Sequence, residues 1–87
     1  AINMFYYTYM LKSISPGYKK TYVGYSNNLE LRLDKHNTGK GAKSTKGYKW
    51  ILIYKRKFKT KNLAMSFEYK LKNNRLLRAK ILKKTIL

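Results

Sequence analysis

The side chains that could carry out phosphate chemistry gather in one stretch of this 87-residue chain. The stretch runs from Thr21 to Gly47 and reads TYVGYSNNLELRLDKHNTGKGAKSTKG. Within it, Arg32 could clamp a phosphate through two parallel hydrogen bonds and stabilise the charge that develops in phosphoryl transfer. Outside it, Tyr9 upstream and Glu68 downstream could join this chemistry. We expect the rest of the chain to serve mainly as the scaffold that positions these groups.

Glu68 is the only carboxylate after Asp34, and lysines surround it in the sequence. A lone carboxylate near bound phosphates is repulsive unless it holds a hard divalent cation. Mg²⁺ commonly uses one or two carboxylates together with phosphate oxygens and water, so one glutamate suffices. The alternative is an ordinary surface glutamate that pairs with Lys72 at position i+4. Both interpretations are open on the residues alone.

The chain contains nine tyrosines, more than a core of this size needs. A tyrosine can stack on a nucleic-acid base, or it can accept or donate a proton through its phenol. Packing is the ordinary role of an isolated tyrosine, and it is the alternative for each of them. The candidates for stacking on unpaired bases are Tyr6, Tyr18, Tyr25 and Tyr48.

The segment from Gly39 to Gly47, GKGAKSTKG, combines three glycines with Lys40, Lys43 and Lys46. Small residues leave backbone N–H groups accessible and lysines add positive charge, a combination suited to phosphate. The segment lacks the Gly-Lys-Ser/Thr ending of a P-loop, which excludes nucleoside triphosphate binding of that type. The alternative is a flexible, solvated loop.

Two strands at the start of the chain must position Tyr9. Residues 5–11 are dense in β-forming side chains, and bulk on both faces predicts a central strand. A turn at Ser15-Pro16-Gly17 leads to a second strand over residues 20–25, which completes a β-hairpin. Gly24 interrupts this strand and predicts a bulge or a close approach of another group. The alternation places Phe5, Tyr7, Tyr9 and Leu11 on one face of the first strand and Tyr6, Thr8 and Met10 on the other.

A helix over residues 29–37 must position the next two groups. Its N-cap lies among residues 26–28, and Gly39 ends it. At 100° per residue, Arg32 and His36 fall at the edge of the apolar stripe and not on the solvent face. An arginine at the border of a core, with a histidine four residues later on the same side, is an unusual placement for solubilising charge.

The second half of the chain supplies a third strand and two helices. Residues 48–58 read as a strand with Trp50, Leu52 and Tyr54 on one face and Ile51 and Ile53 on the other. A helix capped by Thr60 carries an apolar stripe that Glu68 borders; the stripe consists of Leu63, Ala64, Phe67 and Leu71. Asn73-Asn74 separates it from a last basic helix over residues 76–84, in which Leu77 and Ile81 are spaced to pack. The order β-β-α-β-α-α predicts an α+β fold, a three-stranded and mostly antiparallel sheet flanked by helices.

Length, composition and net charge limit the classes of protein to which this chain can belong. A chain of 87 residues makes one domain, spanning residues 1–87, and residues 1–3 could precede a native start at Met4. There is no cysteine and only one histidine, so a structural metal cage is not expected.

The net charge of +18 favours nucleic acid as partner over an anionic membrane, because the basic residues spread over several elements. No apolar run reaches the ~20 residues that span a bilayer, and we expect a cytoplasmic protein, associated with the nucleoid when bound.

From Tyr6 to about Lys72 the chain resembles the GIY-YIG nuclease domain. The resemblance rests on Thr8-Tyr9 in the first predicted strand, Tyr22-Val23-Gly24 in the second, Arg32 ten residues after Tyr22, His36 four residues later, and Glu68 on a following helix. One departure is the first motif, where Tyr7-Thr8-Tyr9 replaces Gly-Ile-Tyr and keeps the tyrosine. The segment HNTGKGAKSTKG is similar to small single-domain bacterial members with a URI-type domain, whereas SPGYKKTYVGYS resembles the nuclease subunit of the Slx junction endonucleases. That subunit carries a cysteine-rich zinc domain, and its absence favours the small stand-alone group.

The resemblance implies roles for two tyrosines. Tyr9 would act as the general base for the attacking water, and Tyr22 would support it through a hydrogen bond to Tyr9 or to the phosphate. Because the ordinary pKa of tyrosine is about 10, this role requires a pKa lowered by nearby cations. The cations expected to do so are Arg32, Lys43 or a bound metal ion.

The resemblance also implies that Glu68 holds one divalent ion, Mg²⁺ or Mn²⁺, on the phosphate. Arg32 would stabilise the added negative charge, and His36 would bond a tyrosine or a phosphate oxygen. Lys43 would be an auxiliary cationic contact, and Lys40, Lys46 and Tyr25 would bind the nucleic acid.

The expected function is a metal-dependent endonuclease that hydrolyses DNA phosphodiester bonds. Without a recognition domain, we expect selectivity for single-stranded or branched DNA and not for sequence. The alternative is a non-catalytic, basic nucleic-acid-binding module on the same fold. Charge serves both equally, whereas a pure binding module would gain from losing the carboxylate of Glu68.

Overall fold

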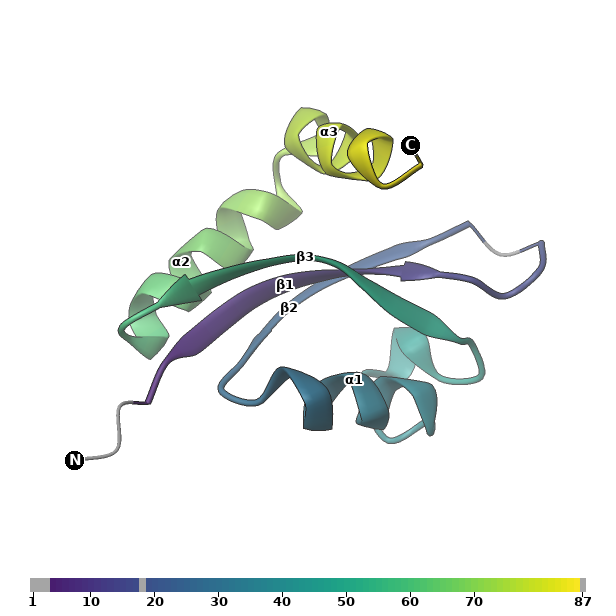
Figure 1. Ribbon diagram of the computed structural model, residues 1–87, viewed down its shortest axis with the longest axis horizontal. Helices are drawn as coiled ribbons and strands as arrows, with labels where there is room; N and C mark the ends of the chain where they lie inside the picture. The colour runs from purple at the N-terminus through teal and green to yellow at the C-terminus, as the bar shows by residue number, and fades with distance from the viewer. Residues whose placement is uncertain (1–3, 18, 87) are drawn as a thin grey trace.

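The computed structural model describes residues 4–17 and 19–86, so residues 1–3 and the stacking role predicted for Tyr18 lie outside the described residues. The order of the elements is the predicted one (Figure 1). The strands are β1 (Tyr6–Ser13), β2 (Thr21–Ser26) and β3 (Trp50–Phe58), and the helices are α1 (Leu29–Asn37), α2 (Lys61–Lys72) and α3 (Arg75–Ile86). A short 3₁₀ turn, Lys43–Thr45, lies between α1 and β3. In the described part of the chain, no helix is long and apolar enough to cross a membrane.

The sheet has the order β2-β1-β3, and both pairings are antiparallel. The predicted central position of the first strand is therefore confirmed. The bulk on both faces of β1 explains this position, because the strand is covered on both sides. Tyr9 and Leu11 belong to one buried cluster and Met10 to another, as the alternation predicts.

The predicted alternation of β3 is wrong at Tyr54. The register with β1 pairs Met10 with Tyr54 but Leu11 with Leu52, so Ile53 is an extra residue that forms a β-bulge. The bulge moves Tyr54 to the face opposite Leu52, where it packs together with Ile53. The bulge depends on pairing with a strand about 40 residues away along the chain, which the local pattern of β3 does not encode.

Helices cover the two faces of the sheet separately. In Figure 1, α2 and α3 lie on one side of the sheet, whereas α1 and the 3₁₀ turn lie on the other. The cluster under α1 is centred on Tyr9, Leu11 and Trp50. The cluster under α2 and α3 consists of Met10, Val23, Leu71 and Ile81, with Phe67 and Leu77 packed against it. The sheet therefore separates two small cores, and Tyr9 belongs to the one that α1 covers.

Helix α2 is tied to the central strand by a residue of the altered first motif. The Thr8 hydroxyl, fully buried, donates a hydrogen bond of 2.7 Å to the carbonyl of Ala64. A hydroxyl at this position is satisfied in the interior only because that carbonyl faces it. Leu63 does not belong to the buried stripe, because 53% of its surface is exposed. The apolar face of α2 is thus narrower than predicted.

Candidate active site

Tyr9 reaches the site by lying across Gly24. The two residues are paired in the register of β1 and β2, which continues without a bulge through this point. A Cβ atom on Gly24 would come within 2.5 Å of the Tyr9 Oη atom and 2.7 Å of its Cζ atom. Of the two predictions for Gly24, the close approach is therefore the one found. The glycine leaves the space in which the buried tyrosine side chain lies.

Helix α1 presents Arg32 and His36 to this tyrosine. Its N-cap is Asn28, whose side chain accepts from the N–H of Leu31 at 3.1 Å. At its C-terminus Gly39 has φ +80°, which fits the predicted glycine cap. His36 is fully buried and Arg32 is half-buried, as their place at the edge of the apolar stripe predicts.

Two side chains, those of His36 and Arg32, converge on the hydroxyl oxygen of Tyr9. The Tyr9 Oη atom lies 2.9 Å from His36 Nε2, and Arg32 Nε–H donates to the same oxygen at 3.4 Å. The ring of Tyr22 packs against His36, with 4.7 Å between the ring centroids, and lies 6.4 Å from the ring of Tyr9. The structure therefore brings together four of the five predicted catalytic residues around the Tyr9 hydroxyl.

The glycine-rich segment contributes to the site in a way that the sequence pattern did not reveal. Thr45 is fully buried, and its Oγ1 atom lies 2.8 Å from His36 Nδ1. Gly41 lies directly over the same ring, because a Cβ atom there would approach His36 Nδ1 to 2.5 Å. The segment is therefore not simply a solvated loop, since part of it encloses His36.

Asn37, whose role was not predicted from the sequence, joins the segments that enclose His36 through two hydrogen bonds. Asn37 donates from Nδ2 to the carbonyl of Trp50 at 3.1 Å and accepts the N–H of Trp50 at 2.6 Å. The Trp50 indole N–H in turn donates to the carbonyl of Thr45 at 3.0 Å. The C-terminus of α1, the start of β3 and the 3₁₀ turn are thus joined around the histidine. The only sequence signal for this was an asparagine directly after His36.

Burial shifts the pKa values of Tyr9 and His36 in opposite directions. It raises the pKa of Tyr9 to about 12, although the hydrogen bond from Arg32 acts in the opposite direction. Burial also lowers the pKa of His36 to about 4, and the positive charge of Arg32 adds to this effect. Arg32 therefore acts in the expected direction, but burial outweighs it, and the net lowering expected for the Tyr9 pKa is wrong for the protein alone. At neutral pH, Tyr9 is a protonated phenol beside an uncharged imidazole.

The lowered pKa of His36 predicts a loss of stability in acid. The unfolded chain binds a proton at its only histidine near pH 6.5, whereas the folded chain does so near pH 4. The contribution of the neutral His36 to the free energy of unfolding is therefore fully present above pH 6.5. It falls as the pH drops towards 4, by about 3 kcal/mol for a difference of this size between the two pKa values. Urea unfolding at pH 7.5, 5.5 and 4.5 would measure the loss. The variant His36→Gln should lack this component, and equal pH dependence in both proteins would contradict the prediction.

Glu68 lies near the site but is not bonded to it. Its negative charge adds a small contribution to the raised pKa of Tyr9, which indicates electrostatic proximity. Its side chain is 19% exposed, and its Oε1 atom lies 3.4 Å from the Nζ atom of Lys72. The i+4 ion pair considered from the sequence is thus present. Since an exposed lysine can swing away, this pair does not prevent Glu68 from binding another cation.

The residues predicted to bind nucleic acid lie outside the hydrogen-bonded cluster of Tyr9. Lys40, Lys43 and Lys46 are exposed, and Tyr25 is half-buried. In the described part of the chain, no hydrogen bond or ion pair joins them to Tyr9 or to His36. The expected help of Lys43 in lowering the Tyr9 pKa is therefore not found.

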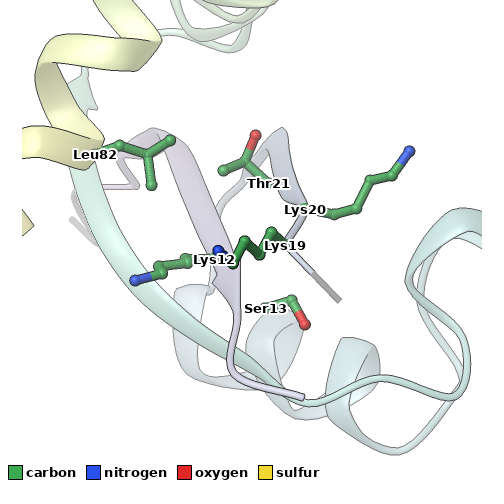
Figure 2. Close-up of a pocket in the computed structure, with 6 residues that line it drawn as sticks. All are labelled: Lys12, Ser13, Lys19, Lys20, Thr21 and Leu82. Atoms are coloured by element: carbon green, nitrogen blue, oxygen red, sulfur yellow. The ribbon is translucent and has the colours of Figure 1, made fainter. Parts of the chain in front are cut away.

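Two pockets differ in their relation to this cluster. Arg32 lines a shallow pocket of about 220 Å³ at the N-terminal end of α1, together with Ser26, Asn27, Asn28, Leu31 and Lys35. A larger pocket of about 430 Å³ lies at the hairpin, where Leu82 of α3 faces the strands, and Figure 2 shows that Lys12 and Lys20 extend away from each other there. Arg32 is the one member of the Tyr9 cluster among the residues that line the first pocket, and no member of the cluster lines the second. We place the candidate site at the pocket of Arg32, despite its smaller volume.

Comparison with known proteins gives one consistent family. A family model described as the GIY-YIG catalytic domain matches residues 5–80. A UPF0213 protein of Oceanobacillus iheyensis is 44% identical over 68 residues, which cover 77% of this chain and 76% of that protein. A UPF0213 protein of Staphylococcus haemolyticus is 40% identical over 68 residues, covering 77% and 79%. The solution NMR structure of a UPF0213 protein from Bacillus halodurans has 32% sequence identity and a TM-score of 0.48, and the match covers 94% of this chain and 85% of that one.

Proposed function

The chain belongs to the GIY-YIG catalytic domain family, and we propose that it is a metal-dependent endonuclease that hydrolyses DNA phosphodiester bonds. The family match confirms the resemblance to the GIY-YIG domain that the sequence shows. The observation that carries the proposal is the position of the Tyr9 hydroxyl between a proton acceptor, His36 Nε2, and a cation, Arg32. A hydroxyl placed in this way can take a proton from water while it gives up its own.

The proton pathway follows from the protonation of the two groups. Because burial raises the pKa of Tyr9 and lowers that of His36, the starting state is a neutral phenol that donates to a free imidazole nitrogen. When a water oxygen attacks the phosphorus, its proton passes to Tyr9 Oη and the phenol proton passes to His36 Nε2. The bond between phosphorus and the leaving sugar oxygen breaks, and that oxygen takes a proton from solvent. In this scheme Tyr9 relays the proton, so no free phenolate is required.

Arg32 is suited to hold the phosphate beside Tyr9. Its guanidinium bonds the tyrosine through Nε, and it borders the pocket at the start of α1. Hydrogen bonding to Tyr9 raises the pKa of Arg32 above its ordinary value, so its charge is permanent. A phosphate bound there would neutralise part of the charge that lowers the pKa of His36. Substrate binding would thus make His36 a better proton acceptor.

Glu68 is the residue of this site that would hold a divalent cation. Within residues 4–17 and 19–86, no group of three His, Cys, Asp or Glu side chains is arranged to bind a metal. A half-buried carboxylate within electrostatic range of Tyr9 fits an ion such as Mg²⁺ or Mn²⁺ that completes its shell with phosphate oxygens and water. Such an ion, when bound, supplies positive charge that stabilises the phosphate and the leaving oxygen.

The proposed substrate is single-stranded or branched DNA. The net charge of +18 supports binding to a polyanion, and the exposed Lys40, Lys43 and Lys46 belong to the segment that encloses His36. Half-buried Tyr25, next to Gly24 in β2, is the proposed stacking residue. Binding through phosphates should weaken steeply as salt increases.

Cleavage of end-labelled DNA tests the proposal directly. Single-stranded, flapped and duplex substrates are incubated with the protein in low salt, with Mg²⁺ or Mn²⁺ and separately with EDTA. We expect shorter fragments with either metal, most from the single-stranded and flapped substrates, and none with EDTA. Salt-dependent binding without cleavage of any substrate would contradict the nuclease and favour a non-catalytic binding module.

A further inference from the structure

The contact on the far side of the His36 ring determines which nitrogen carries its proton. The Thr45 hydroxyl donates to the carbonyl of Ala42 at 2.8 Å, and a carbonyl oxygen can only accept. The single proton of that hydroxyl is therefore used, so its oxygen can only accept from His36 Nδ1 at 2.8 Å. This assigns the proton of the neutral imidazole to Nδ1 and leaves Nε2 as an acceptor towards Tyr9.

We propose that Thr45 is a positioning residue that holds His36 in the Nδ1–H tautomer, so that Nε2 can accept the proton of Tyr9. This inference rests on the proposed function, since it concerns the same proton pathway. Thr45 does not touch the reacting atoms and acts only through the histidine. A base held by a third group is the general arrangement of hydrolytic triads, in which the third group fixes both tautomer and orientation.

Counting hydrogen bonds supports this tautomer over the other. With Nδ1–H, four bonds form in sequence: Arg32 to Tyr9, Tyr9 to His36, His36 to Thr45 and Thr45 to Ala42. With Nε2–H, the histidine donates to a Tyr9 oxygen that already accepts from Arg32. The phenol proton, in a side chain only 1% exposed, then has no acceptor among these groups. An unsatisfied buried donor is costly, so the network favours Nδ1–H.

The fold holds Thr45 rigidly enough to act in this way. The 3₁₀ turn Lys43–Thr45 brings its backbone N–H to the carbonyl of Ala42 at 3.0 Å. The Trp50 indole fixes its carbonyl from the other side. Gly41 closes over the ring and leaves no room for a side chain. The hydroxyl orients the imidazole without adding charge, unlike the carboxylate found at this position in many triads.

The tautomer can be read directly, because His36 is the only histidine of the chain. In ¹⁵N-labelled protein, the two imidazole nitrogens of one residue give the whole histidine spectrum. We expect the wild type at pH 7.5 to show a protonated Nδ1 and an unprotonated Nε2. A wild-type spectrum with protonated Nε2 would overturn the proposal whatever the variants do.

Three variants distinguish the effect of losing the Thr45 hydroxyl from the effect of disturbing the fold. Thr45→Val keeps the shape but cannot accept, so the Nδ1–H population should fall and cleavage should drop about tenfold to a hundredfold. Thr45→Ser keeps a hydroxyl and should therefore show both the Nδ1–H population and the cleavage of the wild type. Ser44→Ala removes the exposed hydroxyl next to it in the same turn and should change neither.

The two readouts distinguish the failure of this inference from that of the proposed function. If Thr45→Val keeps wild-type cleavage or the wild-type tautomer, the positioning role is contradicted. If the wild type cleaves no DNA but its tautomer depends on Thr45, the positioning role stands and the nuclease proposal fails. Should Thr45→Val fail to fold, the wild-type tautomer and the Thr45→Ser spectrum remain decisive.

Discussion

The variant Tyr9→Phe should lose DNA cleavage by a factor of about 10² to 10⁴, the range that a positioned proton-transfer group contributes. The substitution removes one oxygen, the atom that joins His36 Nε2 at 2.9 Å and Arg32 Nε at 3.4 Å. Without it, the attacking water has no relay to the imidazole, while the ring still packs over Gly24. Single-turnover cleavage at saturating protein, with Mg²⁺, would measure the loss in the chemical step and not in binding.

A second tyrosine of the same strand provides the control. Tyr7 lies two positions earlier in β1, is half-buried, and takes no part in the bonded cluster. Among the described residues no hydrogen bond joins Tyr7 to Tyr9, His36 or Arg32, so Tyr7→Phe should cleave within about twofold of the wild type. Because Tyr9→Phe leaves the buried His36 Nε2 atom without its donor, a destabilisation of about 1–3 kcal/mol is expected, and urea unfolding must establish that both variants are folded under assay conditions. Equal cleavage by the two variants would contradict the relay.

Much of this site could be predicted from local patterns. Arg32 and His36 have helical spacing, and the helical period alone places both at the edge of a core. Gly24 could be identified because an isolated glycine in a strand requires a reason, and the reason is the ring of Tyr9. The element order followed from strand periodicity, the turn at Ser15-Pro16-Gly17 and the asparagines that end α2 and begin α3. These features depend on neighbours a few residues apart, which a sequence displays directly.

What could not be predicted depends on contacts between distant segments. Thr45 is one of several small residues in a basic, glycine-rich segment, and its burial arises only when β3 packs beside the C-terminus of α1. The bulge at Ile53 likewise arises from pairing with β1. The direction of the Tyr9 pKa followed from burial, which outweighs the cation beside it. Charge can be counted in a sequence, but desolvation becomes known only with the packing.

The position of the site also links its chemistry to the core. Tyr9 and Leu11 pack in the same cluster on the face of the sheet that α1 covers, so the hydroxyl proposed to act in catalysis belongs to a core side chain. Glu68 comes from α2, which packs mainly on the opposite face. In the proposed mechanism, a group from each face of the sheet therefore contributes. A variant of Glu68 can change the chemistry without changing the core, because its side chain lies outside both buried clusters.

Glu68→Gln should accordingly reduce cleavage about 10²- to 10³-fold, similar to the loss of one group that stabilises a transition state. The amide keeps the size of the side chain but is a poor ligand for Mg²⁺, which prefers charged oxygen donors. Stability should change by no more than about 0.5 kcal/mol, since the substitution removes only an i+4 ion pair whose lysine is exposed. Titration with Mn²⁺, followed by paramagnetic broadening of backbone signals near residue 68, would measure metal binding independently of cleavage.

Lys72→Gln is the matched control, because it removes the same ion pair from its other end and keeps the carboxylate. If Glu68 acts as a metal ligand, this variant should lose the same small amount of stability and retain cleavage and Mn²⁺ broadening. If both variants cleave like the wild type, Glu68 is an ordinary helix residue whose partner is Lys72. If both lose cleavage equally, the ion pair itself matters and the carboxylate has no separate role. Only an asymmetric result, with cleavage lost at Glu68 and kept at Lys72, fits a glutamate that exchanges its lysine for a divalent cation when substrate binds.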